Sequence, residues 1–192
     1  MSNKNQILNL NFSSKQLATA GLLVAMEIIF TRFFSVMIPI GGIGGIRLGL
    51  GPVPIIISGL LFGPVLGGFV GGGANILGFW MNTYGVAFPN PLIFLATVMY
   101  GVLPPLILKF LKSSQPPSRV HMCIAILITQ LVSSIFLTTY GLQFIYGVPF
   151  ISILPPRILS NFVLIPGYSI ICTFIYTKIY QSPAVKTIQN NP

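Results

Sequence analysis

The longest uncharged stretch of the chain, residues 48–81, limits the possible folds more than any other feature. About 20 apolar residues in a helix cross the hydrocarbon core of a bilayer, so this stretch is long for one span and short for two. It is interrupted at Gly63-Pro64, where flexible glycine precedes a residue that lacks a backbone N–H. The stretch therefore predicts a short helix over 52–62 and a longer one over 64–81.

The low charge of the whole chain extends this membrane interpretation to the other segments. Of the 192 residues, 54% are hydrophobic and only 6% are charged, whereas soluble domains average about 25% charged residues. The composition predicts an all-α integral membrane protein with one membrane domain, residues 17–180. A polar N-terminus, 1–16, and a polar tail, 181–192, flank that domain. The apolar run after Lys15 is too long for a signal-peptide core and is counted as a span.

Six transmembrane helices are expected in all. The four further apolar runs with the length of a span are 17–38, 92–111, 120–138 and 158–180. Pro39 and the glycines of 41–45 end the first of these. Residues 140–156 mix aromatics, glycine and prolines, and we expect them to form an ordered, partly membrane-embedded loop.

The distribution of positive charge predicts how the bundle is oriented. The net charge is +9, from ten Lys/Arg and one acid. These charges are too sparse for a groove that follows nucleic-acid phosphates. With six spans, one side of the membrane carries most of the cations, and the positive-inside rule makes that side, with both termini, cytoplasmic. Its cations are Lys4, Lys15, Lys109, Lys112, Arg119, Lys178 and Lys186.

The remaining three cations, Arg32, Arg47 and Arg157, lie at or near the outer side, and all are arginine. The planar guanidinium binds carboxylates through two hydrogen bonds at once. Glycines around Arg47 allow a ligand to approach the backbone closely, and Asn161 follows Arg157 at i+4, on the same helical face. Snorkelling to outer headgroups is the alternative for Arg32, and a lipid-facing loop cation is the alternative for Arg47.

The chain lacks the residues that most catalytic and metal sites need. It has no Asp and a single carboxylate, Glu27, which we interpret as a structural partner within the bundle. There is no Ser-His-Asp set and no GxxxxGK[ST] phosphate loop, which excludes an ATPase within this chain. Cys123 and Cys172 fall in apolar segments, as buried thiols do. We therefore expect a binding protein that is not an enzyme and holds neither cofactor nor metal.

Small and aromatic residues form two further patterns. Gly21-x-x-x-Ala25 permits close contact between helices, and a denser set of glycines over 67–74 predicts packing within the bundle. Aromatic residues cluster in the expected outer loops, where they form either an interfacial belt or a stacking pocket for a flat heterocycle. They are Phe79, Trp80, Tyr84, Phe88, Tyr140, Phe144, Tyr146 and Phe150.

Several segments, in order and over nearly the whole chain, resemble the S components of energy-coupling factor (ECF) vitamin importers, and the folate-specific group is the nearest. The resemblance is carried by Glu27-Ile-Ile-Phe-Thr-Arg-Phe33, Ile46-Arg-Leu-Gly-Leu-Gly-Pro-Val-Pro-Ile55, Gly59-Leu-Leu-Phe-Gly-Pro64, Tyr146-Gly-Val-Pro-Phe150 and Leu154-Pro-Pro-Arg-Ile-Leu-Ser-Asn161. It implies a six-helix subunit in a prokaryotic plasma membrane that binds a vitamin from outside. Its partners would be a transmembrane coupling subunit (EcfT-type) and two cytoplasmic ATPases (EcfA-type), which use the ATP.

By position in the family, Gly21 and Ala25 would contact the coupling subunit. The residues on the ligand side would be Arg47, Arg157 and Asn161, with Arg32, Tyr140, Asn75 and Tyr84 as further candidates. Asn75 stands where many folate members have an acid, and Phe88-Pro-Asn-Pro-Leu92 replaces their usual turn. Pantothenate and hydroxymethylpyrimidine therefore stay open beside folate. A stand-alone secondary carrier and a structural membrane protein are the alternatives from other classes.

Overall fold

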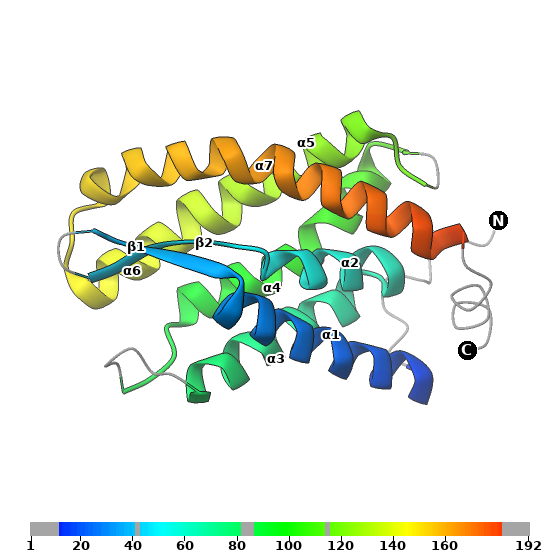
Figure 1. Ribbon diagram of the computed structural model, residues 1–192, viewed down its shortest axis with the longest axis horizontal. Helices are drawn as coiled ribbons and strands as arrows, with labels where there is room; N and C mark the ends of the chain where they lie inside the picture. Colours follow the sequence, from blue (N-terminus) through cyan, green and yellow to red (C-terminus); the bar gives the residue numbers. More distant parts are fainter. Residues whose placement is uncertain (1–11, 41–42, 82–86, 114–115, 182–192) are drawn as a thin grey trace.

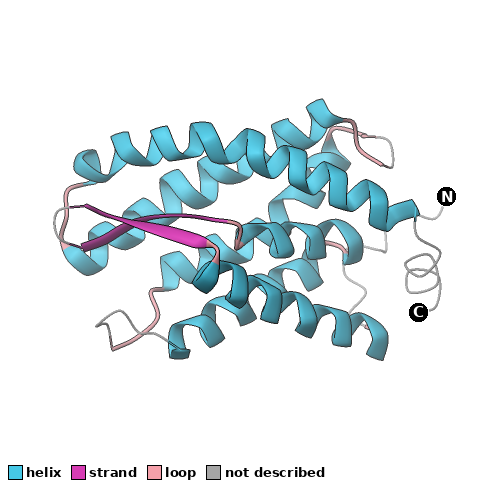
Figure 2. Cartoon of the chain, viewed as in Figure 1, coloured by secondary structure: helices cyan, strands magenta, loops and turns pink. Residues whose placement is uncertain are grey.

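The computed structural model describes residues 12–40, 43–81, 87–113 and 116–181. Over these residues the chain forms a bundle of six helical bodies with one β-hairpin (Figures 1 and 2). Four helices are long and apolar enough to cross a membrane, and α2 is a shorter apolar helix. The first four helices are α1 (Ser14–Phe33), α2 (Pro52–Phe62), α3 (Pro64–Met81) and α4 (Pro91–Phe110).

The predicted break inside the uncharged stretch is confirmed. Helix α2 ends at Phe62 and α3 begins at Pro64. Between them Gly63 has φ +92°, a backbone conformation that residues with a Cβ rarely adopt. The glycine therefore turns the chain, and the proline that follows is tolerated because the first residue of a helix needs no N–H partner.

The fifth helical body is longer than the sequence predicts. Helix α5 (Arg119–Gln130) continues through the π-helix η2 (Leu131–Thr138) into α6 (Thr139–Tyr146) and ends at left-handed Gly147. The last body, α7 (Phe150–Gln181), begins eight residues before the expected start at Ile158. The predicted loop over 140–156 is thus wrong. In an apolar medium the backbone satisfies its own hydrogen bonds best as a helix, so the helices extend through the aromatic and proline-containing segments.

The first helix, in contrast, ends earlier than predicted. It stops at Phe33, and residues expected to be helix and glycine-rich loop form an antiparallel hairpin of β1 (Ser35–Ile40) and β2 (Ile43–Gly49). The first strand contains Val36, Ile38 and Ile40, whose branched side chains favour extended backbone, and the second begins with Ile43. The register shifts between Ile38 and Pro39. Proline lacks a backbone N–H, and a strand tolerates it at such an irregularity of the pairing. The bundle is therefore helical with a small sheet added.

Three glycines bring α2, α3 and α4 into backbone contact. A Cβ added to Gly59 would lie 2.1 Å from the carbonyl oxygen of Gly101, and one added to Gly101 would lie 2.1 Å from that of Gly67. A Cβ added to Gly71 would lie 2.3 Å from the Thr97 carbonyl oxygen. Packing by the small residues of the third helix, as predicted, is confirmed, and α4 is the helix that lies against them.

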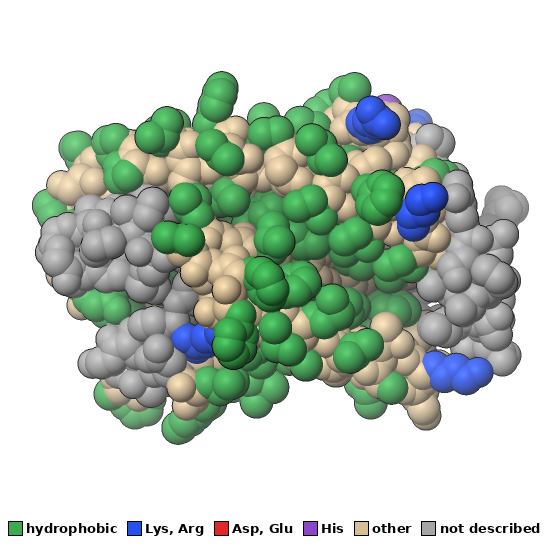
Figure 3. Space-filling model, viewed as in Figure 1, with side chains coloured by type: hydrophobic (Ala, Val, Ile, Leu, Met, Phe, Trp, Pro, Cys, Tyr) green, Lys and Arg blue, Asp and Glu red, His purple; other side chains and the backbone are tan. Residues whose placement is uncertain are grey.

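The two ends of the bundle differ in character. The hairpin and α6 lie at one end, the hairpin end, and the described chain begins and finishes at the other, the termini end (Figure 1). In Figure 3 most Lys and Arg side chains lie toward the termini end, with a further patch toward the hairpin end, and hydrophobic side chains cover much of the face between the ends. Exposed residues such as Phe162, at 80%, and Ile170, at 70%, lie along α7. Such a surface fits a surrounding of lipid.

The glycine contacts predict that Gly101→Ala lowers stability by about 2 kcal/mol or more, because the new methyl group pushes α3 and α4 apart. The thermal unfolding midpoint of the purified protein in detergent measures this effect. Gly167→Ala is the matched control, since nothing lies within 4 Å of its added Cβ. Equal midpoints for Gly101→Ala and the wild type would contradict the proposed contact.

Candidate ligand cavity

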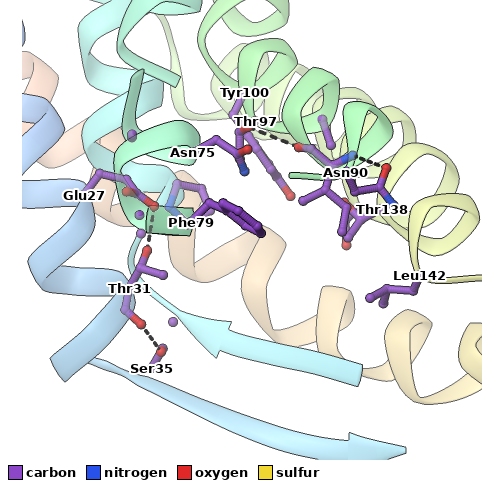
Figure 4. A pocket seen from close by; sticks show the side chains of 18 of the residues that line it. Glu27, Thr31, Ser35, Asn75, Phe79, Asn90, Thr97, Tyr100, Thr138 and Leu142 are labelled. Atoms are coloured by element: carbon purple, nitrogen blue, oxygen red, sulfur yellow. Dashed lines mark hydrogen bonds between the residues drawn. The ribbon is translucent and has the colours of Figure 1, made fainter. Parts of the chain in front are cut away.

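The described helices surround a partly open cavity of about 590 Å³ toward the hairpin end. This volume lies within the range of small-molecule sites. The lining comes from α1, the start of α2, α3, α4, η2, α6 and α7, so all six helical bodies contribute. Figure 4 shows polar side chains on opposite sides of the cavity, with Glu27 and Thr31 on one side and Asn90 and Thr138 on the other.

The first polar side is built by α1 and α3. Thr31 Oγ1 donates a hydrogen bond to Glu27 Oε1 at 2.6 Å, and the two residues are one turn apart on α1. Arg32 Nη2 donates to the carbonyl oxygen of Gly78 near the end of α3. Asn75 and Phe79 complete this side (Figure 4). It thus combines a carboxylate, an arginine, an amide and an aromatic ring.

The second polar side is built by α7 against the π-helix. Arg157 is only 6% exposed, and its Nη1 donates to the Ser134 carbonyl oxygen at 3.0 Å and to Ser134 Oγ at 3.4 Å. Asn161 Nδ2 donates to the same Oγ at 3.2 Å. Through these hydrogen bonds Ser134 holds the guanidinium at the cavity wall. Ser134 lies in a π-helix, whose wider turns change which backbone groups pair, and such segments are frequent at functional sites.

Two further hydrogen bonds connect the helices around the cavity. Asn90 caps α4, since its Oδ1 accepts from Leu92 N at 2.8 Å, and its Nδ2 donates to the Gly141 carbonyl oxygen on α6 at 2.6 Å. Tyr100 donates its hydroxyl to Gln130 Oε1 at 2.6 Å, across α4 and α5. These bonds join α4 to α6 and to α5 at the wall of the cavity.

The structure brings together only some of the predicted ligand residues. Arg32, Asn75 and Arg157 line the cavity, whereas Asn161, 2% exposed, does not line it and donates to Ser134 Oγ instead. Tyr140 does not line it: the side chain is 52% exposed and its ring lies 4.8 Å from that of Phe150, centre to centre.

Of four other predicted residues, two fall outside the described side chains and two lie away from the cavity. Arg47 pairs with Met37 in the hairpin, but its side chain falls outside the described part of the chain, as does the whole of Tyr84. Gly21 and Ala25 are exposed on α1, away from the cavity lining, and nothing lies within 4 Å of a Cβ added to Gly21.

Sequence reasoning missed several polar residues of the cavity wall. Gln130, Ser134 and Thr138 all line it and follow one another at intervals of four. Polar side chains on one face of an apolar span are costly in lipid, so this spacing was the available signal. Glu27, interpreted above as a purely structural group, also lies in the cavity wall.

The hairpin is attached to the cavity by α7. Tyr168, which is 2% exposed, donates its hydroxyl to the carbonyl oxygen of Gly49, the last residue of β2. A Cβ on Gly51, two residues later, would lie 2.1 Å from Thr31 Oγ1. The connection from the hairpin to α2 is therefore held between α1 and α7.

Comparison with known proteins places these features in context. The family model described as "ECF-type riboflavin transporter, S component" matches residues 11–182. The folate transporter FolT of Clostridium novyi (strain NT) is 32% identical over 151 residues, covering 78% of this chain and 80% of that protein.

Two solved structures share the fold. The crystal structure of FolT bound with folic acid has a TM-score of 0.72 at 22% identity, covering 87% of this chain and 95% of that one. The S component for biotin from an ECF-type ABC transporter has a TM-score of 0.62 at 22% identity, covering 88% and 92%.

The hairpin attachment predicts a local effect of Tyr168→Phe. Loss of one hydrogen bond of about 1 kcal/mol should speed backbone hydrogen exchange in β2 roughly fivefold, because the strand end opens more often. Mass spectrometry of exchanged, digested protein measures this, and α2 serves as the internal control. Unchanged exchange in β2, or an equal rise in α2, would contradict a local anchor.

Proposed function

We propose that this chain, which belongs to the family of S components of ECF-type transporters, binds a folate-type vitamin in the cavity and delivers it for import. The chain supplies binding specificity and no chemistry of its own, and ATP is hydrolysed by partner subunits. Support comes from the partly open cavity at the hairpin end and from the relatives, one of which is a folate transporter and another a structure with folic acid.

The observation that carries the proposal is the position of Arg157. A guanidinium buried at membrane depth is expensive and usually marks a substrate site. Here it lines the cavity and is oriented by Ser134, so the long side chain is already ordered and loses little conformational entropy when a ligand binds. Its planar group suits a carboxylate, and folate carries carboxylates on its glutamate tail.

The rest of the cavity suits the aromatic part of such a ligand. Apolar and aromatic groups from α3, α4 and α7, including Phe79, Ile93 and Leu164, line the wall between the polar groups. An offset aromatic contact with one of these rings stabilises a flat heterocycle by about 1 kcal/mol beyond the area it buries. A long ligand with a flat ring and an anionic tail therefore fits the cavity better than a small polar solute does.

The ligand is identified by direct titration. Calorimetry of the purified protein in lipid nanodiscs, with folate, riboflavin, biotin, pantothenate and hydroxymethylpyrimidine, compares the vitamins suggested by the relatives with those left open by the sequence. Submicromolar binding of folate alone supports the proposal. Tighter binding of any other vitamin in the panel replaces the proposed ligand and leaves the class intact.

The role of Arg157 predicts that Arg157→Lys weakens folate binding roughly tenfold, because lysine keeps the positive charge but cannot donate two parallel hydrogen bonds to a carboxylate. Arg157→Ala, which removes both the charge and the donors, should weaken binding roughly 100-fold. Arg119→Ala is the control, since Arg119 is exposed at the start of α5, at the termini end. The same titrations with folate amidated at both glutamate carboxylates should show little dependence on residue 157. An equal loss for folate and its diamide would argue against carboxylate binding.

The proposal includes an orientation and partners. The described cations of the termini end, such as Lys15 and Lys178, support a cytoplasmic position for that end by the positive-inside rule. The cavity then faces the outer side of a prokaryotic plasma membrane. A coupling subunit would pack against the exposed small-residue surface of α1 at Gly21 and Ala25, where a partner helix can approach the backbone.

This docking surface predicts a separation of binding from transport. Gly21→Leu should leave the folate affinity of the isolated protein unchanged and should abolish uptake of labelled folate, because the side chain blocks close helix contact. Uptake is measured in cells that also express the coupling subunit and ATPases. Leu22→Ile, an exposed neighbour on α1, is the control. Uptake that persists without the ATPases would instead favour a stand-alone carrier.

A further inference from the structure

The only carboxylate of the chain, Glu27, lies in the wall of the cavity. We propose that Glu27 is a specificity-determining residue, whose carboxylate accepts hydrogen bonds from the N–H donors of an amino-substituted heterocycle. This inference rests on the proposed function, since it names the part of the vitamin that binds at the α1–α3 side of the cavity. Arg157, on α7, would bind the anionic part of the vitamin at the opposite side of the cavity.

The position of the carboxylate is set by its neighbours. Thr31 Oγ1 donates to Glu27 Oε1 at 2.6 Å, which orients the group within α1. The start of α2 packs against the same pair: a Cβ on Gly51 would lie 3.2 Å from Glu27 Oε1. A carboxylate has about four acceptor positions, so it can hold Thr31 and ligand donors at the same time.

The surrounding residues suit a flat ring with a polar edge. Asn75 and Phe79, on α3, lie on the same side of the cavity as Glu27 (Figure 4). Phe79 offers a ring for stacking, and the Asn75 amide offers both a donor and an acceptor. An ionised carboxylate is an acceptor only, so it favours a ring edge that carries amino and ring N–H groups and disfavours an edge of acceptors.

Charged side chains line both sides of the cavity, with Glu27 and Arg32 on the α1 side and Arg157 on the α7 side. Glu27 lies on α1 and Arg157 on α7, and different helices position each of them. A ligand with donors at one end and an anion at the other satisfies both sides in a single orientation. A ligand with only one of these features forms hydrogen bonds at one side of the cavity and forgoes those at the other, which lowers its affinity.

The test combines a variant of the protein with a variant of the ligand. Dissociation constants are measured by calorimetry in nanodiscs for wild type and Glu27→Gln, each with folate and with 2-desamino-folate, in which hydrogen replaces the 2-amino group. Thr31→Val tests the orienting hydroxyl. Thr19→Val is its matched control, because the Thr19 hydroxyl donates to the Lys15 carbonyl oxygen on the same helix, away from the cavity.

We expect the wild type to bind 2-desamino-folate roughly 10- to 100-fold more weakly than folate. Glu27→Gln should lose a similar factor for folate and should bind the two ligands almost equally. Thr31→Val should show a smaller loss of the same kind, and Thr19→Val none.

Three results would overturn the role of Glu27 and leave the proposed function standing. They are equal binding of both ligands by the wild type, unchanged folate affinity in Glu27→Gln, and a loss in Glu27→Gln of the same size for both ligands, as a purely structural role requires. Wild-type protein that binds no folate overturns the proposed function and this inference together.

Discussion

The contact of α2, α3 and α4 through Gly59, Gly67 and Gly101 is the constraint on which the rest of the structure depends. In a bilayer the lipid is as apolar as the side chains, so helices associate through close packing rather than through exclusion of water. Backbone contact at these glycines fixes the three helices as a unit. The core of buried side chains, among them Ile55, Leu66 and Val70, forms around it.

This rigid unit explains why the cavity lies where it does. The glycine contacts hold α3 and α4 together over their middle, and the helices carry polar residues beyond that region, toward the hairpin end. Asn90 and Tyr100 then connect α4 to α6 and α5. A site on packed helices keeps its geometry better than a site on loops. The cavity is thus largely preformed, as vitamin sites need to be for tight binding.

The polar residues that complete the cavity depend on two local irregularities. The π-helix η2 presents the Ser134 carbonyl and hydroxyl to Arg157, and the hairpin ends at Gly49, where Tyr168 holds it. Neither is visible as a regular pattern in the sequence. Both occur where α7 meets an earlier segment, so tertiary contact decides the local conformation. Membrane helices tolerate such departures where they line a cavity rather than face lipid.

The amino-acid sequence by itself determined the membrane class, the helix break at Gly63-Pro64, the packing face of α3 and the resemblance to S components. These follow from local composition and from the cost of charge in lipid. Only the tertiary structure decided which arginines share a cavity, that Glu27 faces it, that Tyr140 does not line it, and that residues 35–49 pair as strands. The physical reason is that a side chain's partners come from helices far apart in the chain, and sequence spacing specifies a helical face without specifying what lies against it.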